Sequence, residues 1–213
     1  MCVIAYYPEG ITPEKSSIEY MMGINRDGAG VGWNDGKRAY MVKGFTDAGR
    51  VFNFIVSLRE RPSVRDIVFH ARIATSGGIS AEKCHPYLLT ANSSELNYTE
   101  ATTTKTPLIF HNGIFSLTPD KGLNDTQTFI RRCLYPLQKL DPRGLKWDRY
   151  DELIEMATGR SRLLMLYPDE VKRFGEWTAD GGALYSNYNF KKPDYSQAFF
   201  RYAGGKWYEE YDG

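Results

Sequence analysis

The chain begins Met1-Cys2-Val3-Ile4-Ala5-Tyr6, which places a cysteine directly behind the initiator methionine and at the head of an apolar, strand-like segment. If Met1 is removed, Cys2 carries a thiol and a free α-amino group on the same residue. An α-amine with a pKa of about 7.7–8.0 can accept a proton near neutrality, and a terminal amine that activates the first side chain is a known route to covalent catalysis. By position alone, an ordinary buried cysteine in a first strand is the more common case. The rest of the chain has to decide between the two interpretations.

Composition excludes several classes of protein. The 213 residues carry 27 basic and 26 acidic side chains spread along the chain, so clustered positive charge for a sequence-independent grip on nucleic acid is missing. No apolar run approaches the roughly 18 residues of a membrane span, and the N-terminus lacks the features of a signal peptide. Three widely spaced cysteines do not resemble a disulfide framework. We therefore expect one domain over residues 1–213, located in the cytoplasm, with no nucleic-acid or membrane partner.

Hydrophobic periodicity predicts an α+β layered architecture of antiparallel strand pairs with interspersed helices. The apolar stripe of residues 48–59 predicts an amphipathic helix, and further helices are expected at residues 12–22, capped by Thr12, at 126–134 and at 150–157. Strands are expected at residues 1–6, 38–42, 67–73, 107–110, 162–167, 171–177 and 183–186, and the glycine-rich stretch 25–33 is expected to lead into a further strand. Residues 91–106 are polar and read as a surface excursion. The aromatic tail from Tyr195 is expected to pack on the body as an edge strand.

Arg72 lies at the end of a predicted strand, next to the flexible segment Thr75-Ser76-Gly77-Gly78. Binding residues often occupy such loop positions on a rigid scaffold. A guanidinium there can hold a carboxylate through two parallel hydrogen bonds, and the two glycines could hinge a lid over a site. The alternative for Arg72 is a surface salt bridge.

The turn His111-Asn112-Gly113 ends another predicted strand. The side-chain amide of Asn112 and the backbone N–H of Gly113 could together form an oxyanion hole, in which one donor is typically worth about 10²–10³ in rate. The alternative is an ordinary Asn-Gly turn. Asp125 could bind an ammonium group, cap the helix that follows, or do both.

Two other sequence features are interpreted structurally. Cys84 and His85 are neighbours, and adjacent side chains on an extended chain point apart, so a catalytic dyad between them is not expected. His111 is interpreted as a turn residue. Three histidines and three cysteines without metal-ligand spacing predict neither a metal site nor a cofactor.

Taken together, these motifs resemble the class II glutamine amidotransferase family of the N-terminal-nucleophile hydrolases. The resemblance covers residues 1–129, and more loosely 162–187. It rests on motifs in family order: Cys2, Arg26 to Gly30, Arg72-Ile73-Ala74-Thr75 with His85-Pro86, His111-Asn112-Gly113 and Asn124-Asp125-Thr126. It implies a four-layer αββα sandwich, with two antiparallel sheets between helical layers.

The implied chemistry is hydrolysis of L-glutamine to glutamate and ammonia through a γ-glutamyl thioester on Cys2. By the same resemblance, Asn112 and Gly113 form the oxyanion hole and Arg72 holds the substrate α-carboxylate. Thr75 contributes to that grip, and Asp125 holds the α-amino group.

The chain departs from the family in three respects. Glucosamine-phosphate synthase relatives have tryptophan and histidine where this chain has Ile73 and Ser76, and the segment between Asn112 and Asp125 is short. Family members also usually carry a synthetase domain that consumes the ammonia, for which this chain has no room. We therefore expect a stand-alone domain, of the kind associated with phage and bacterial accessory genes, that serves a separate synthetase. Its oligomeric state is left open.

Two alternatives remain at this point. The first is another N-terminal-nucleophile amidohydrolase, acting on γ-glutamyl compounds or small amides. The second is a non-catalytic module that has kept the fold.

Overall fold

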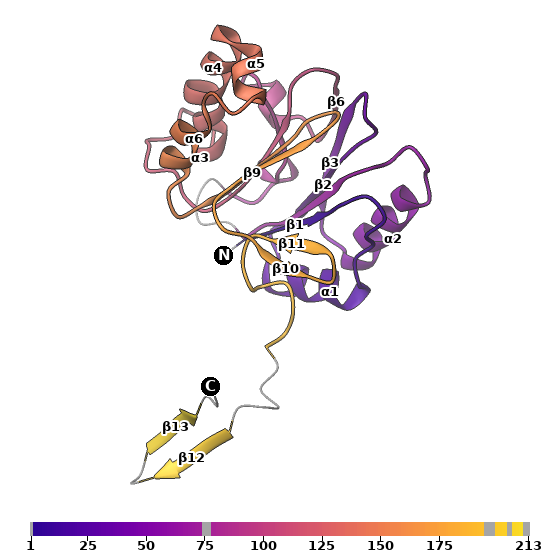
Figure 1. The fold of residues 1–213 in the computed structure, drawn as a ribbon, viewed down its shortest axis with the longest axis vertical. Helices are drawn as coiled ribbons and strands as arrows, with labels where there is room; N and C mark the ends of the chain where they lie inside the picture. The colour runs from indigo at the N-terminus through magenta and orange to yellow at the C-terminus, as the bar shows by residue number, and fades with distance from the viewer. Residues whose placement is uncertain (1, 74–77, 194–198, 204–205, 211–213) are drawn as a thin grey trace.

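The computed structural model of the chain describes residues 2–73, 78–193, 199–203 and 206–210. Its strands form one large sheet of seven strands, a second sheet of four strands, and a separate two-stranded hairpin. All the strand pairings are antiparallel. Helices lie on the outer sides of the two main sheets (Figure 1).

The large sheet has the strand order β10-β11-β1-β4-β2-β3-β6. Its strands are, in that order, Thr178–Asp180, Ala183–Tyr185, Val3–Tyr7, Ile67–Ala71, Ala29–Asn34, Ala39–Phe45 and Glu100–Thr103. The first strand, β1, therefore lies inside the sheet, paired with β11 on one side and β4 on the other. In its register with β4, Val3 is opposite Ala71. One step further along the same register places Cys2 opposite Arg72.

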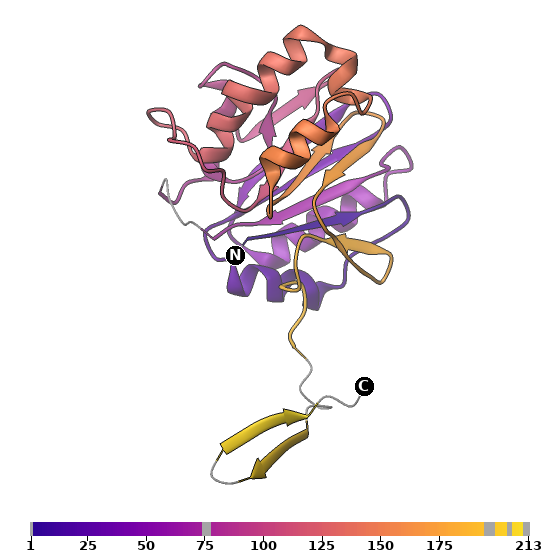
Figure 2. The ribbon, with the colours of Figure 1, turned by 60° about the vertical axis from the view of Figure 1, so that its left-hand side comes forward.

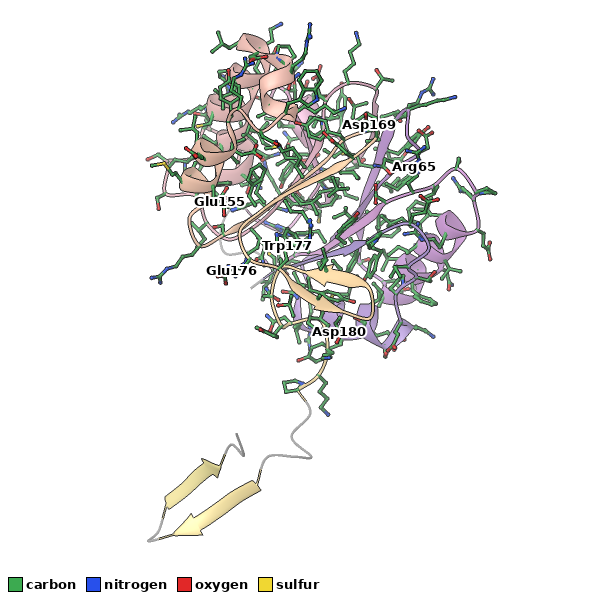
Figure 3. All side chains as sticks on the ribbon, viewed as in Figure 1. Arg65, Glu155, Asp169, Glu176, Trp177 and Asp180 are labelled. Carbon is green, nitrogen blue, oxygen red and sulfur yellow. The ribbon has the colours of Figure 1, made fainter. Side chains whose placement is uncertain are left out.

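The small sheet has the order β5-β7-β8-β9, with strands Tyr87–Leu88, Leu108–Asn112, Arg162–Leu166 and Val171–Phe174. The chain passes from this sheet to β10 of the large sheet through residues 175–177. Trp177 packs there against the core between the two sheets, and Figure 3 shows it beside Glu176 at the crossing. The two sheets are thus joined by a short covalent connection close to β11 and β1.

Three separate hydrophobic cores define the layers. Helices α1 (Lys15–Ile24) and α2 (Ala48–Arg59) cover the outer face of the large sheet. Residues such as Ile4, Val68 and Phe110 fill the space between the sheets. The outer face of the small sheet packs against a third core, which includes Ile130 and Ile154. The elements of this second helical layer are α3 (Asp125–Phe129), a π-helical turn (Ile130–Leu134), α4 (Tyr135–Leu140), α5 (Pro142–Lys146) and α6 (Asp151–Thr158).

These layers, which Figure 2 shows after a turn of 60°, make the αββα sandwich that the family resemblance implies. Two short 3₁₀ turns, Ala81–Lys83 and Glu95–Asn97, lie in the connections. Within the described residues, no helix has the length and apolarity needed to cross a bilayer.

The structure differs from the sequence interpretation in three details. The first helix begins at Lys15 after Glu14 rather than at Thr12, and its N-cap residue makes no side-chain hydrogen bond. The polar excursion at residues 91–106 contains β6, which is the outermost strand next to β3. The tail does not add a strand to the body, because β12 (Phe199–Ala203) and β13 (Lys206–Glu210) pair with each other in their own sheet.

Candidate active site

Side-chain alternation places the candidate residues on the inner faces of the two sheets. In β1, Val3 contributes to the core beneath the helices, whereas Ile4 contributes to the core between the sheets. Since side chains alternate along a strand, Cys2 lies on the same side as Ile4. By the same rule, Arg72 follows Val68 in β4 and Asn112 follows Phe110 in β7. The sequence therefore brings these residues to the same inter-sheet layer from three different strands.

The thiol of Cys2 contacts the backbone of Ile73. The N–H of Ile73 donates to the Cys2 sulfur over 3.3 Å, and the thiol lies 3.4 Å from the carbonyl oxygen of the same residue. Burial raises the pKa of the Cys2 thiol above its ordinary value, although the Ile73 N–H, the positive chain terminus and Arg72 act in the opposite direction. A thiol held in its neutral form needs a base before it can attack, because the thiolate is the nucleophile.

Arg72 is 5% exposed, which removes the surface salt bridge as an interpretation of this residue. Its Nη2 donates to the carbonyl oxygen of Gly78 over 2.9 Å. Its backbone is held by the loop before β2, since the Arg72 N–H donates to the Gly28 carbonyl and the Arg72 carbonyl accepts from the Asp27 N–H. These contacts fix both the backbone and the guanidinium of Arg72, whose charge acts on the Cys2 thiol. Thr75, which the sequence assigns to the same substrate contact, lies outside the described residues.

Asn112 and Gly113 occupy the end of β7 and the turn that follows it. Asn112 is 6% exposed, and its side-chain nitrogen donates to the hydroxyl of Ser186 over 2.8 Å. Gly113 has φ +150°, and a Cβ built there would lie 1.9 Å from the Ser161 hydroxyl oxygen. Only glycine fits this position, because any side chain meets both strain and a steric clash.

Asp125 is the first residue of α3, and it is connected to the turn that follows Gly113. Its Oδ2 accepts from the backbone N–H of Phe115 over 2.9 Å. The N-cap of the helix is Asn124, which forms a capping box with Gln127. Of the two roles considered for Asp125, capping therefore belongs to its neighbour. The short segment after Asn112 brings the Asp125 carboxylate back to the turn that follows Gly113.

A buried polar network that the sequence analysis missed holds this helix start in place. The ammonium of Lys83 donates to the Gln127 side chain over 3.0 Å, and Gln127 donates to the Leu96 carbonyl over 3.0 Å. Asn124 donates to the hydroxyl of Tyr87 over 2.7 Å. Both Arg72 and Asp125 act electrostatically on the Tyr87 hydroxyl. The network therefore links the loop that follows the Arg72 strand to the helix that carries Asp125.

Ser186 and Asn187, directly after β11, were also missed. The Ser186 hydroxyl accepts from the backbone N–H of Ile4 over 2.8 Å as well as from Asn112. The Asn187 side chain donates to the carbonyl oxygen of Cys2 over 2.7 Å, across 185 residues of sequence. Neither residue belongs to a recognisable sequence motif. Their contacts with Cys2, Ile4 and Asn112 follow only from the order of the strands.

All three histidines of the chain are buried near this site. The rings of His70 and His85 are 4.2 Å apart, and the His111 ring stacks on Phe115 at 4.0 Å. Burial lowers the pKa of His70 and of His111 to about 3, and holds that of His85 well below its usual value. Neutral histidines that titrate this low are poor general bases at pH 7. Packing against aromatic rings is consistent with structural roles for His85 and His111.

A cavity of about 480 Å³ opens elsewhere, between the start of α1 and the β10–β11 hairpin. Tyr7, Tyr185 and Phe190 line it, on the helix side of β1. It contains none of the candidate residues and no cysteine or histidine, so we do not assign the chemistry to it.

Comparison with solved structures identifies the fold. The glutamine phosphoribosylpyrophosphate amidotransferase of B. subtilis, complexed with ADP and GMP, matches with a TM-score of 0.53 and 16% identity. A structure described as the allosteric regulatory enzyme of purine biosynthesis matches with a TM-score of 0.55 and 18% identity. Each match covers 87% of this chain and 41% of the other chain.

No protein-family model matches the sequence, and neither does any curated protein. Because the sequence identities are only 16% and 18%, the structural match establishes the fold and nothing more. The chain has the N-terminal-nucleophile hydrolase fold of the class II glutamine amidotransferases, as its motifs predict. It spans less than half the length of the solved chains it resembles.

Proposed function

We propose that this protein hydrolyses L-glutamine to glutamate and ammonia, with Cys2 as the nucleophile. One observation carries the proposal: in the fold of the class II glutamine amidotransferases, the Cys2 thiol contacts the backbone of Ile73 and is acted on electrostatically by the buried guanidinium of Arg72. A buried cation beside a thiol at a chain terminus suits a substrate with a carboxylate at one end and a reactive amide at the other.

In the proposed reaction, removal of Met1 exposes the α-amine of Cys2. The amine takes the thiol proton, and the sulfur attacks the γ-carboxamide carbon of glutamine to form a C–S bond. The side-chain N–H of Asn112 and the backbone N–H of Gly113 stabilise the oxyanion. The intermediate then expels ammonia, which receives the proton held by the amine, and leaves a γ-glutamyl thioester. Water, deprotonated by the same amine, hydrolyses the thioester to glutamate and restores the thiol.

The head group of the substrate defines the remaining roles. Arg72 binds the α-carboxylate, to which Thr75 contributes, and Asp125 binds the α-ammonium. The two charges of an amino acid thus meet opposite charges supplied by two different layers of the sandwich. This pattern favours an amino acid over an uncharged amide as substrate.

We propose that the ammonia passes to a separate ammonia-consuming synthetase. One of the solved structures that the chain resembles is an amidotransferase, whose name implies an acceptor for the amide nitrogen. The three cysteines are free thiols. A reactive thiol persists in a reducing compartment, and we place the protein in the cytoplasm on that ground.

The test is glutamate release from glutamine by purified protein whose intact mass shows loss of Met1. Cys2→Ala should abolish glutamate release. Cys133→Ala, which changes a half-buried cysteine in the helical layer on the small sheet, should leave glutamate release unchanged. A panel of γ-glutamyl compounds identifies the preferred leaving group. Processed protein that turns over none of these substrates would contradict the proposal.

A further inference from the structure

The hydroxyl of Ser186 receives two hydrogen bonds from two different parts of the candidate site. One comes from the backbone N–H of Ile4, two residues after Cys2, over 2.8 Å, and the other from the side-chain nitrogen of Asn112, also over 2.8 Å. A serine oxygen has two acceptor lone pairs, so both are in use. Ser186 is 1% exposed, and its own N–H donates to the Ile4 carbonyl over 3.0 Å.

Asn187 extends this contact to the nucleophile itself. Its side-chain amide donates to the carbonyl oxygen of Cys2 over 2.7 Å. The carbonyl belongs to the peptide that links Cys2 to Val3, so the bond restricts rotation of the residue whose amine and thiol react. The two consecutive residues therefore contact the nucleophile strand of the large sheet and the oxyanion asparagine of the small sheet.

We propose that Ser186 and Asn187 are positioning residues that hold the Asn112 amide and the Cys2 backbone in one fixed geometry, an inference that rests on the proposed function. A carboxamide nitrogen carries two protons. Ser186 accepts one of them, which leaves the second for the oxyanion. An oxyanion donor is effective only when it is held close to its final position before the reaction.

The Ser186 hydroxyl connects residues of two different sheets through its hydrogen bonds with Asn112 and Ile4. Asn112 lies at the end of β7, whereas Cys2 precedes β1, and these strands belong to different sheets. Without Ser186, no side-chain hydrogen bond in the described residues would connect the Asn112 amide to the strand that follows Cys2. Misplacement of a reacting group by about 1 Å costs about 100-fold in rate.

The first test is a double-mutant cycle on glutamine hydrolysis. Ser186→Ala should lower kcat about 10- to 100-fold with KM changed less than about twofold, because the lost contact orients a transition-state donor. In an Asn112→Ala background the same substitution should have little further effect on kcat, since the group it positions is gone. Ser186→Thr keeps the hydroxyl and should restore most of the rate.

Two further variants are needed: Asn187→Ala tests the contact with Cys2, and Ser17→Ala is the control. Asn187→Ala should lower kcat by a smaller factor, about 3- to 10-fold, because one of several contacts on the Cys2 backbone is lost. Ser17 donates to the Phe190 carbonyl over 2.8 Å on the helix side of the large sheet, so Ser17→Ala removes a comparable hydroxyl away from Cys2. Its kcat should remain within about twofold of the unsubstituted protein.

The second test does not depend on turnover. Hydrogen exchange of the Asn112 side-chain amide, followed by NMR, should be slow in the unsubstituted protein, fast in Ser186→Ala and slow again in Ser186→Thr. If Ser186→Ala does not fold, Ser186→Cys replaces it, because a thiol is a weak acceptor.

The outcomes separate the two proposals. Protein that releases no glutamate but shows the expected exchange pattern contradicts the glutaminase and supports the positioning role. The positioning role alone is overturned by a different result in active protein. In that case Ser186→Ala lowers kcat by the same factor in the Asn112 and Asn112→Ala backgrounds, and it leaves the exchange rate of the Asn112 amide unchanged.

Discussion

The sulfur of Cys2 lies 3.3 Å from the backbone nitrogen of Ile73, the residue that follows the buried guanidinium of Arg72. Both groups stabilise a thiolate, yet burial outweighs them and raises the pKa of the thiol. The reaction that we propose therefore starts from a neutral thiol and a base. Because the α-amine of the same residue is the nearest available base after Met1 is removed, its protonation state should control the rate.

We predict that kcat/KM for glutamine rises with pH through the pKa of the Cys2 α-amine. A free α-amine titrates at about 7.7–8.0. The base must be unprotonated, so activity should be lost as pH falls below that value. A pH–rate profile on protein of verified mass measures it. A profile that is flat from pH 6 to pH 9 would show that the amine is not the base.

Gly113→Ala should abolish activity and lower the free energy of unfolding by about 2–5 kcal/mol. The new Cβ would meet the Ser161 hydroxyl oxygen at 1.9 Å, at a φ of +150°. Removal of that oxygen by Ser161→Ala should not rescue the variant, because the Ser161 Cβ lies 2.4 Å from the same point. Urea unfolding and glutamate release measure the two effects.

The matched control for this prediction is Gly122→Ala. Gly122 has φ +78° with nothing within 4 Å of an added Cβ, so this variant keeps the backbone strain and lacks the clash. It should cost about 1 kcal/mol and retain activity. Equal losses in the two variants would mean that strain, not the contact with Ser161, makes glycine necessary at position 113.

Asp125→Asn should raise KM for glutamine about 10- to 100-fold while the protein stays folded. An asparagine oxygen can still accept from the Phe115 N–H, as Oδ2 of Asp125 does over 2.9 Å, so the loop remains attached to the helix. What is lost is the charge that meets the substrate ammonium. Asp120→Asn, which changes a carboxylate paired with Arg131 and Arg132, is the control and should leave KM unchanged. An unaltered KM in Asp125→Asn would remove Asp125 from the substrate site.

The sequence predicted those features of the fold whose pattern is local. The apolar stripe of Val51, Ile55 and Leu58 is buried on the large sheet, and the helix that carries it has the bounds expected, residues 48–59. Arg72 and Asn112 were identified because each ends a strand with a strong apolar pattern. Their roles toward a substrate remain predictions.

The contacts that hold those residues could not be predicted, because they join distant segments. Ser186 meets Ile4 and Asn112 only through the strand order of the two sheets. Lys83 looks like a surface charge in the sequence, although it binds the side chain of Gln127. Strand β6 was not predicted because it is an edge strand with exposed, polar positions. Such a strand has no apolar face, so its sequence lacks the alternation of apolar and polar residues that indicates a strand.

The buried histidines predict how stability depends on pH. Burial holds the pKa of His70 near 3, against about 6.5 in the unfolded chain. The unfolded state therefore binds more protons between these values, so the contribution of His70 to stability is complete above pH 6.5 and is lost as pH falls toward 3. At pH 5 this histidine alone should lower the free energy of unfolding by about 2 kcal/mol relative to pH 7. Urea unfolding at the two values measures the difference.

The variant that isolates this effect is His70→Gln, which removes the titrating ring and keeps a polar side chain. Its free energy of unfolding should be lower at pH 7, because the contact with the His85 ring at 4.2 Å is lost. Its decline between pH 7 and pH 5 should be shallower than that of the unsubstituted protein, since one group with a depressed pKa is gone. Parallel declines in the two proteins would show that His70 is protonated in the folded state and that the ring is not held neutral by burial.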